Sequence, residues 1–440
     1  MSPQIIVIGA GMAGIMAART LQEAGYDVRV LEGRPRIGGR THTDSSLGPD
    51  IDLGAAWIHG PHGNPLTPLA QQYEVGTGYT DFHNLTGDKV LAFDKDGRQL
   101  DTAAYTRGEH IFRGALAHIF GSILYPPPPE SCRSLADLHA YGLPNIHLDE
   151  LTDDERLGYY YAGFLRPQYE DASDLHLIDW RQGEEYLKLP GGDLLVHGGG
   201  FGQMIRGLAE GLTIHTDCPV THIHYHADGV VLETAQGQMN ADAAVITVPL
   251  GVLQAGKISF TPALPEAKTA AIGRIGMGFY EKIALKFPHI FWPLRPQRMN
   301  YLEDGDLPLY TSWLNNAHYS GQPILVAYHS GSRAQHINQL SDQELIAGCM
   351  ATLRKLFGTD IPDPISYVRT NWEQDPFSCG SYSYGKVGSS LADRATLAEA
   401  VGGRLFFAGE ATHPHYTGTV HGAYETGIRA AQQLMAAIPT

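Results

Sequence analysis

Gln4-Ile-Ile-Val-Ile-Gly-Ala-Gly-Met-Ala-Gly14 is the stretch of this sequence that decides the fold. An apolar run over residues 4–9 predicts a buried strand, and the Gly-x-Gly-x-x-Gly pattern that follows opens a helix predicted over 13–25. A second strand is predicted over 27–31. Strand, helix and strand together form a βαβ unit, so we expect a Rossmann-like domain in this part of the chain.

The three glycines of this pattern, with Ala13 at the start of the helix, have the spacing of a dinucleotide site. Gly9 permits the tight turn, Gly11 lets a pyrophosphate approach the backbone, and Gly14 lets the helix pack closely on the strand. The helix N-terminus offers N–H groups and positive potential to the phosphates. Glu32 ends the second strand, where a carboxylate accepts the ribose hydroxyls and repels a 2′-phosphate. The pattern predicts a dinucleotide but does not choose between NAD and FAD.

The charge balance limits the possible partners. The chain has 440 residues, with 47 acidic and 31 basic side chains and a formal net charge of −16. Nucleic acids and anionic membrane surfaces are therefore unfavourable partners, whereas a small cation would be attracted. The sequence shows no secretory leader before the first strand and no run of about 20 apolar residues. We expect a cytoplasmic protein without a membrane partner.

No metal is expected. The four cysteines are scattered and form no Cys-x-x-Cys pair, which argues against a disulfide framework and against a zinc site. His413, His415 and His421 lie close together in sequence, but they follow a glycine-containing loop and have no further ligand residues at metal-site spacing.

The segment after Glu32, Gly33-Arg-Pro-Arg-Ile-Gly-Gly-Arg40, resembles the flavin-containing amine oxidase family. That family includes monoamine oxidases, polyamine oxidases and lysine-specific histone demethylases. Further segments resemble it in the family's order, and they lie at 52–66, 217–220, 248–253, 407–412 and 417–423. The resemblance implies that FAD is the dinucleotide and that Arg40 binds its phosphates through charge-assisted hydrogen bonds. It also implies cofactor contacts by Gly39, Gly54, Ala55, Ala56, Trp57, Val220, Trp372, Glu410, Thr419 and Val420.

Two interleaved domains are predicted, since one core rarely serves a chain of this length. The expected fold class is a Rossmann-like FAD-binding domain (α/β) interleaved with a mixed-sheet and helical substrate-binding domain (α+β). The first domain takes 1–80, 190–278 and 380–440, and the second takes 81–189 and 279–379. Further helices are predicted over 64–73, 109–124, 201–212, 345–357 and 418–437.

Lys282 is the expected catalytic residue. It resembles the family lysine whose ammonium holds a water near flavin atom N5. Strand alternation alone places it on the same side as Lys286 and opposite Ile283, and by itself indicates a solvated strand lysine. The resemblance implies that flavin N5 takes a hydride equivalent from the carbon beside an uncharged substrate nitrogen. The imine then hydrolyses to an aldehyde and an amine, and O2 reoxidises the flavin with release of hydrogen peroxide.

The substrate slot is expected between aromatic rings. Tyr382 and Trp372 would form its walls by packing and cation–π contact, although ordinary core packing is the alternative for each ring. Thr419 stands where the monoamine oxidases have a second tyrosine of the substrate cage. One aromatic wall is therefore expected to be missing, which favours a slim aliphatic chain over an arylalkylamine.

Polar side chains are expected to bind the far end of a cationic substrate. His59 and Glu170 match positions that face the substrate in polyamine oxidases, and Glu184 and Glu185 are weaker candidates. For each of these acids, a solvated surface carboxylate is an equally good interpretation.

The FAD is expected to be non-covalent. Monoamine oxidases attach their flavin through a cysteine just before the position of Tyr382. Ser381 occupies that position here, and Cys379 is two residues away.

These features favour a polyamine oxidase acting on spermidine, spermine or their acetylated forms, with O2 as the second substrate. At 440 residues, the sequence is expected to have no room for the coiled-coil insertion or the additional helical domain of the histone demethylases. An L-amino acid oxidase needs a buried arginine for the substrate carboxylate, and no motif position assigns one. A monoamine oxidase, an amine dehydrogenase with another electron acceptor, and a non-catalytic flavin-binding module stay open as alternatives. Lys282, Trp372 and Tyr382 argue against the last of these.

Overall fold

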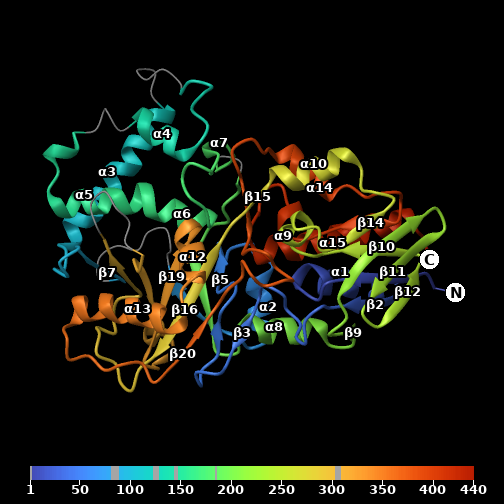
Figure 1. Cartoon of the computed structure of the whole chain (residues 1–440), viewed down its shortest axis with the longest axis horizontal. Coiled ribbons are helices and arrows are strands. Elements are labelled where there is room, and N and C mark those ends of the chain that lie inside the picture. Colours follow the sequence, from blue (N-terminus) through green and yellow to red (C-terminus); the bar gives the residue numbers. More distant parts are fainter. Residues whose placement is uncertain (1, 81–88, 122–127, 143–146, 184–185, 303–308) are drawn as a thin grey trace.

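The computed structural model describes residues 2–80, 89–121, 128–142, 147–183, 186–302 and 309–440. Figure 1 shows an elongated molecule. A five-stranded sheet lies toward one end, together with both termini, and a six-stranded sheet lies toward the other, together with a group of helices. The expected combination of a Rossmann-like unit with a mixed-sheet and helical unit is confirmed.

The five-stranded sheet is parallel and has the order β22-β13-β1-β2-β9. One face packs on helices α1 (Met12–Glu23) and α15 (Val420–Ala437), which cover alternate strand residues such as Val7. The two helices approach closely because Gly427 has no side chain: a Cβ there would lie 2.3 Å from the carbonyl oxygen of Ala13. The strands are Gln4–Ile8 (β1), Asp27–Leu31 (β2), Thr213–His215 (β9), Ala243–Ile246 (β13) and Leu405–Phe407 (β22).

A four-stranded sheet of order β12-β11-β10-β14 covers the other face. Its inner residues alternate with outer ones, so Ile223 and Leu232 pack against Ile6 of the parallel sheet while polar side chains face outward. The strands are Val220–His226 (β10), Gly229–Thr234 (β11), Gly237–Ala241 (β12) and Ser259–Thr261 (β14).

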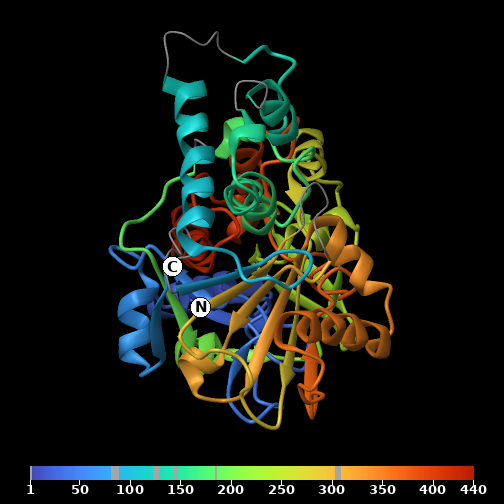
Figure 2. The ribbon, with the colours of Figure 1, turned by 90° about the vertical axis from the view of Figure 1, so that its left-hand side faces the viewer.

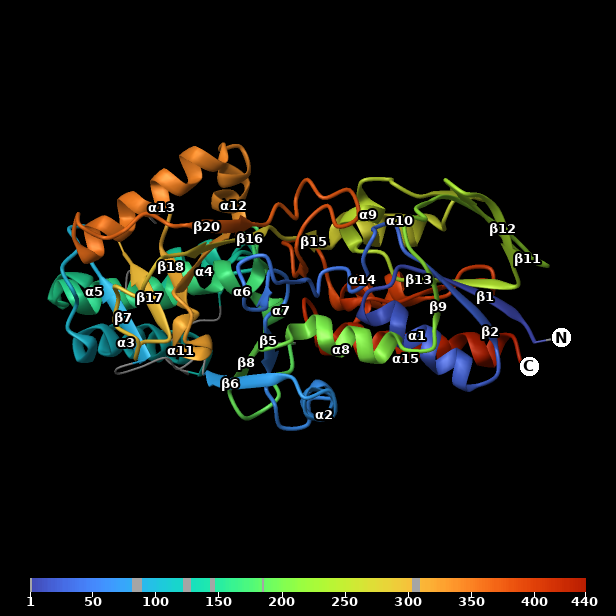
Figure 3. The same ribbon diagram turned by 90° about the horizontal axis from the view of Figure 1, so that it is seen from below.

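The six-stranded sheet has the order β20-β16-β19-β18-β17-β7 and is antiparallel except for the parallel pair β17 and β7. Figure 3 shows α12 (Gly331–Asn338) and α13 (Asp342–Phe357) on one side of this sheet, with α3 and α5 on the other. The strands are Val90–Phe93 (β7), Tyr280–Lys286 (β16), Arg298–Tyr301 (β17), Ser312–Asn315 (β18), Ile324–Ser330 (β19) and Ser366–Arg369 (β20).

The helical group packs on this sheet through a core that includes Tyr105, Leu165 and Tyr328. Figure 2 looks at this end of the molecule, where α3 (cyan) stands beside the other helices of the group. A π-helical turn, Tyr161–Leu165, joins α5 to α6. The helices are Thr102–Gly121 (α3), Leu135–Gly142 (α4), Asp153–Tyr160 (α5), Arg166–Asp171 (α6) and Trp180–Gly183 (α7).

The remaining elements are mostly short. The remaining strands are Thr43–Asp44 (β3), Ile51–Asp52 (β4), Trp57–His59 (β5), Gly76–Thr80 (β6), Asp193–His197 (β8), Gly276–Met277 (β15) and Ser383–Tyr384 (β21). The remaining α-helices are Leu66–Gln72 (α2), Gly200–Ala209 (α8), Leu250–Gln254 (α9), Glu266–Arg274 (α10), Ala317–Ser320 (α11) and Leu391–Ala398 (α14). Single 3₁₀ turns occur at Leu148–Glu150 and Glu410–Thr412.

Most differences from the predicted elements concern helix ends. The helix predicted over 345–357 begins earlier, at Asp342, because Ser341 and Glu344 form a capping box. The helix predicted over 109–124 begins at Thr102, and residues 122–124 lie outside the described part of the chain. The helix predicted over 201–212 ends at Ala209, since Gly211 takes a φ of +79° that a right-handed helix excludes.

We propose the predicted two-domain division for the described chain, because each large sheet draws its strands from one set of ranges. The parallel sheet uses only 1–80, 190–278 and 380–440, and the six-stranded sheet uses only 81–189 and 279–379. Within the described residues, we find no helix with the length and apolar character that crossing a membrane requires.

Glycine contacts between α3 and α5 generate a stability prediction. A Cβ at Gly108 would lie 1.8 Å from the carbonyl oxygen of Glu155, whereas a Cβ at Gly114 in the same helix meets nothing within 4 Å. Gly108→Ala should therefore destabilise the protein by about 1–3 kcal/mol. Gly114→Ala should raise stability by up to about 1 kcal/mol, because alanine is the better helix former. Thermal unfolding midpoints measure both; a Gly108→Ala midpoint equal to or above that of Gly114→Ala would contradict the close packing.

Candidate active site

One large cavity, of about 1110 Å³, lies between the parallel sheet and the six-stranded sheet with its helices. Its walls come from segments far apart in the sequence, including the loop after β1, the 53–60 segment, α6, β16 and the start of α15. The structure brings nearly all of the sequence-predicted site residues to this cavity. They are Gly9, Gly11, Ala13, Glu32, Gly39, Arg40, Gly54, Ala55, Ala56, Trp57, His59, Glu170, Val220, Lys282, Trp372, Tyr382, Glu410, Thr419 and Val420.

Gly14 is the predicted residue that does not line the cavity. A Cβ at this position would lie 1.9 Å from the carbonyl oxygen of Gly9, so the absence of a side chain lets α1 pack on the turn after β1. Gly9 itself has a φ of +105°, which a residue with a side chain adopts only under strain. Gly14 thus shapes the site without facing it.

Glu32 lies at the end of β2 and is buried. Its carboxylate accepts hydrogen bonds from the backbone N–H groups of Ala10 and Arg34, at 2.8 and 2.9 Å. These bonds orient the carboxylate at the cavity wall, and a carboxylate has further lone pairs for hydroxyl donors. The arrangement suits a ribose.

Arg40 and Glu410 form a second polar centre, with Arg40 Nη1 2.9 Å from Glu410 Oε1. Glu410 also accepts bonds from the Ser383 hydroxyl at 2.6 Å and from the Gly418 N–H at 2.8 Å. Burial acts to raise the pKa of Glu410, but Arg40, Ser383 and Arg394 outweigh it and hold the pKa below its usual value. The anionic Glu410 therefore keeps Arg40 at the wall, where a guanidinium can bind a phosphate.

Lys282 is only 4% exposed, so the interpretation as a solvated strand lysine is wrong. Nζ donates to the carbonyl oxygens of Asp52 and Gly54, at 2.9 and 2.6 Å. An ammonium has three N–H groups, which leaves one for the cavity. Burial lowers the pKa of Lys282, and the negative charge of Asp52 opposes this shift. The side chain is held where it can bind a water or a substrate nitrogen.

Glu281, on the opposite face of β16, is a residue that the sequence analysis missed. It is fully buried and accepts hydrogen bonds from the backbone N–H of Trp372 at 2.7 Å and from the Thr370 hydroxyl at 2.5 Å. Burial raises the pKa of Glu281 to about 7. Trp372 is buried, and its ring meets that of His42 edge to face at 6.4 Å. Glu281 therefore positions the segment that carries this cavity-lining tryptophan.

Aromatic rings surround the end of the cavity near Lys282. Tyr382 donates its hydroxyl to the carbonyl oxygen of Tyr169 at 2.8 Å, and the ring centres of Tyr382 and Tyr280 lie 6.0 Å apart. All three tyrosines line the cavity. The Thr419 side chain instead accepts the N–H of Gly422 and caps α15. Position 419 therefore contributes no ring, and tyrosines from other segments supply the aromatic walls.

The predicted polar residues of the substrate end already have partners. The His59 ring Nδ1 lies 2.8 Å from Asp193 Oδ1, and Glu170 forms an ion pair with Arg166 at 2.9 Å. Both side chains still face the cavity. Glu184 and Glu185 lie outside the described residues.

Asp171 also lines the cavity and was not predicted as a site residue. Among the described residues, none forms a hydrogen bond or an ion pair with its carboxylate. Burial, together with the negative charge of Glu170, raises the pKa of Asp171 to about 7, while Lys188 and Arg394 act in the opposite direction. Its charge also raises the pKa of Tyr382, so the carboxylate lies within electrostatic reach of the aromatic walls. A cationic ligand would supply the missing partner.

The sequence and fold are similar to those of known enzymes. The family model for flavin containing amine oxidoreductases matches residues 12–435. Polyamine oxidase 2 of Arabidopsis thaliana is 37% identical, over 98% of this chain and 88% of that protein. Polyamine oxidase 4 of Oryza sativa subsp. japonica is 35% identical, with the same coverage.

Two further comparisons concern length and fold. Lysine-specific histone demethylase 1 homolog 1 of Oryza sativa subsp. japonica is 34% identical over 99% of this chain, which spans 52% of that protein. The solved structure of a putrescine oxidase double mutant, redesigned in its cofactor binding, has a TM-score of 0.76 and 19% identity. That match covers 99% of both chains, so the fold is shared from one end of the chain to the other.

Proposed function

Because this chain belongs to the flavin-containing amine oxidoreductase family and FAD is its cofactor, we propose that it is a polyamine oxidase. One observation carries the proposal beyond the family: Asp171 is half-buried and offers a carboxylate without an ion-pair partner among the described residues, in the cavity that Lys282 also lines. A polyamine has a second cationic nitrogen for such a group. A monoamine has none.

The residues present fit FAD. Glu32 suits the ribose, and Arg40 with the N-termini of α1 and α15 suits the pyrophosphate, because each offers donors or positive potential to anionic oxygens. Gly11 leaves room at the turn, since a Cβ there would meet only the carbonyl oxygen of Gly38, at 3.8 Å. The cavity is larger than most single-ligand pockets, as a cofactor together with its substrate requires.

The FAD is bound non-covalently. Ser381 lines the cavity. Its hydroxyl accepts a hydrogen bond from the backbone N–H of Tyr280 at 2.6 Å and donates one to the carbonyl oxygen of Tyr280 at 3.0 Å. Cys379 does not line the cavity, and its Sγ lies 3.7 Å from the carbonyl oxygen of Pro376. Cys218 does line it, two residues before Val220 at the nucleotide end.

When bound, FAD supplies the redox chemistry: it takes a hydride equivalent from the carbon beside the substrate nitrogen and passes both electrons to O2, giving hydrogen peroxide and an imine that water converts to an aldehyde and an amine. The protein selects and orients the amine. Tyr169, Tyr280 and Tyr382 exclude water around an aliphatic chain and favour the uncharged form of the reacting nitrogen by desolvation. Lys282 donates its remaining N–H to a water or to the departing nitrogen.

The alternatives differ in what occupies the far end of the cavity. Arg113 and Arg166 also line it, and an amino acid oxidase would use such a group for the substrate carboxylate. Arg166, however, already forms an ion pair with Glu170. A polyamine matches Asp171 and leaves this pair intact.

Flavin bleaching without oxygen across a panel of amines tests the proposed function. Spermidine and spermine should bleach the flavin, benzylamine and leucine should do so at least about tenfold more slowly, and admission of oxygen should restore the colour with release of peroxide. Faster bleaching by leucine or benzylamine would contradict the substrate class. Bleaching that oxygen does not reverse would indicate a dehydrogenase, and a flavin that no amine bleaches would indicate a non-catalytic flavoprotein.

Lys282→Met tests the role of the buried ammonium. The variant should retain FAD but slow flavin reduction or reoxidation at least about tenfold, a change of about 1.4 kcal/mol in the barrier. Lys286→Met is the matched control, because Lys286 lies on the same face of β16 and donates to the carbonyl of Leu47 without lining the cavity. Stopped-flow kinetics measures both half-reactions; unchanged rates for both in Lys282→Met would refute the role.

Asp171→Asn tests recognition of the second charge. Loss of a charge-assisted contact should raise KM for spermidine by about ten- to a hundredfold. Glu170→Gln should have a smaller effect, because Arg166 already compensates that charge. The pKa of Asp171, raised to about 7, adds a pH test: the carboxylate becomes anionic as pH rises through 7, so wild-type kcat/KM for the polyamine should rise there. A similar rise in Asp171→Asn would argue against the assignment.

A further inference from the structure

The outer face of the four-stranded sheet carries a cluster of potential metal-ligand side chains that do not line the cavity. His222 and His224 alternate along β10 and therefore project on the same face. Glu233 lies on the neighbouring strand β11, directly opposite His222. None of the three lines the cavity. The proposed amine oxidation leaves this cluster without a role.

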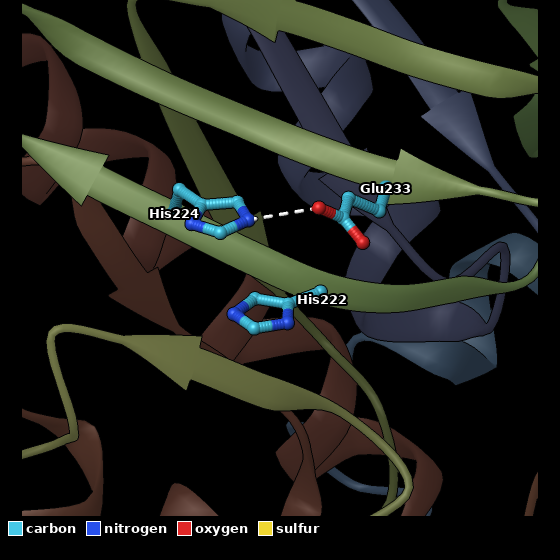
Figure 4. A group of neighbouring side chains, drawn as sticks. All are labelled: His222, His224 and Glu233. Atoms are coloured by element: carbon cyan, nitrogen blue, oxygen red, sulfur yellow. Dashed lines mark hydrogen bonds and ion pairs between the residues drawn. The ribbon is translucent and has the colours of Figure 1, made fainter.

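The three side chains converge. Figure 4 shows both imidazole rings and the Glu233 carboxylate facing one another over the strands, with His224 Nε2 2.9 Å from Glu233 Oε1. The two imidazole rings are stacked, with centres 4.1 Å apart and planes within 4° of parallel. One ligand atom from each residue lies within 4.8 Å of the other two, and all three residues are half-buried. No other such group occurs among the residues that the structure describes.

We propose that His222, His224 and Glu233 bind a divalent transition-metal ion of the zinc class, with water completing its coordination. Two imidazoles and a carboxylate are ligands that such ions prefer, whereas magnesium and calcium prefer oxygen ligands alone. The three ligands leave at least one position open for water or for another small ligand.

The spacing of the ligand atoms suits this ion. A tetrahedral zinc ion, with bonds of about 2.1 Å, holds neighbouring ligand atoms roughly 3.4 Å apart. His224 and Glu233 are already closer than this, and the widest separation in the cluster has to shrink by at most about 1.4 Å from 4.8 Å. Rotation of half-buried side chains can supply that movement without a change in the strands.

Outer partners hold the ligands in place. Thr261 on β14 lies with its hydroxyl 2.8 Å from His222 Nε2, which leaves Nδ1 of that ring for the ion. Gln238 on β12 lies directly opposite Glu233, and its side chain is hydrogen-bonded to the Glu233 carboxylate. Metal-binding histidines and carboxylates in proteins have such hydrogen-bonded partners, which fix their orientation. The site is therefore built from all four strands of the sheet.

A bound ion would stabilise the four-stranded sheet, whose strand β10 begins at the nucleotide end of the cavity. Strand β10 begins at Val220, which lines the cavity two residues before His222. An ion bound by His222 and Glu233 would link β10 to β11 and stabilise the folded sheet, since anything that binds only the folded state does so. We therefore expect zinc to raise the Tm of the FAD-loaded protein.

Zinc titration of the FAD-loaded full chain, stripped of metal and free of any purification tag, tests the proposal. Calorimetry should show one ion bound per chain, and zinc should raise Tm. His222→Gln, His224→Gln and Glu233→Gln should each weaken zinc binding at least about tenfold. Removal of a ligand's hydrogen-bonded partner alone already costs about tenfold in metal affinity, and removal of the ligand itself should cost no less. Magnesium should neither bind nor compete.

His226→Gln is the matched control. His226 lies on the same strand and the same face, but it is exposed and outside the cluster. The His226→Gln variant should bind zinc with the affinity of the wild type. Absence of a one-to-one binding step in the wild type, or equal affinities in His226→Gln and the three ligand variants, would overturn the proposal. Flavin content and amine oxidation by the metal-free variants should equal those of the wild type, so this outcome is independent of the proposed function.

Discussion

The buried ammonium of Lys282 is the contact on which the two halves of the active site depend. Its hydrogen bonds to the carbonyl oxygens of Asp52 and Gly54 connect the six-stranded sheet to the segment that follows β4. Burying a charged group costs several kcal/mol unless partners compensate, so β16 has to keep its register against these carbonyls. On the opposite face of the same strand, Glu281 accepts the backbone N–H of Trp372. Strand β16 thus holds the Lys282 ammonium on one face and, through Glu281 on the other face, the cavity-lining Trp372. The site therefore depends on the register of β16, because a shift by one residue would move each of Lys282 and Glu281 to the other face of the sheet.

Charge is distributed unevenly along the cavity, and this distribution matches a molecule that is anionic at one end and a ligand that is cationic at the other. Arg40 and the N-termini of α1 and α15 provide positive potential where the glycine pattern lies. Asp171 provides negative charge near the tyrosines. The net charge of −16 adds a weak long-range attraction for cations that salt would screen. The local arrangement of charge says more about the cavity than the total charge does, because Arg40 and Asp171 both line it.

Sequence could predict those features that depend on local backbone. The positions of Gly9 and Gly14 follow from the geometry of one turn, and Glu32 from the end of one strand, so a short pattern indicated the parallel sheet and its nucleotide end. Residues defined by tertiary contacts could not be found in this way. Asp171 matters because no described residue pairs with it, and Glu281 because it reaches a backbone N–H 91 residues further along the chain. The cluster at His222 depends on a strand pairing, although the alternation of histidines along β10 was a signal that could have been followed.

The aromatic walls show what a family resemblance at one position leaves out. Thr419 indicated a missing ring, and its hydroxyl indeed caps α15. Tyr169 and Tyr280, from α6 and β16, nevertheless bring rings to the same cavity as Tyr382. Rings from separate segments of the chain therefore line one cavity. The aromatic lining of the cavity thus depends on the packing of the whole site and not on position 419 alone. Because Asp171 follows Tyr169 on the same helix by two residues, one helix positions both a ring of the cavity wall and the carboxylate that we propose for the second charge of the substrate.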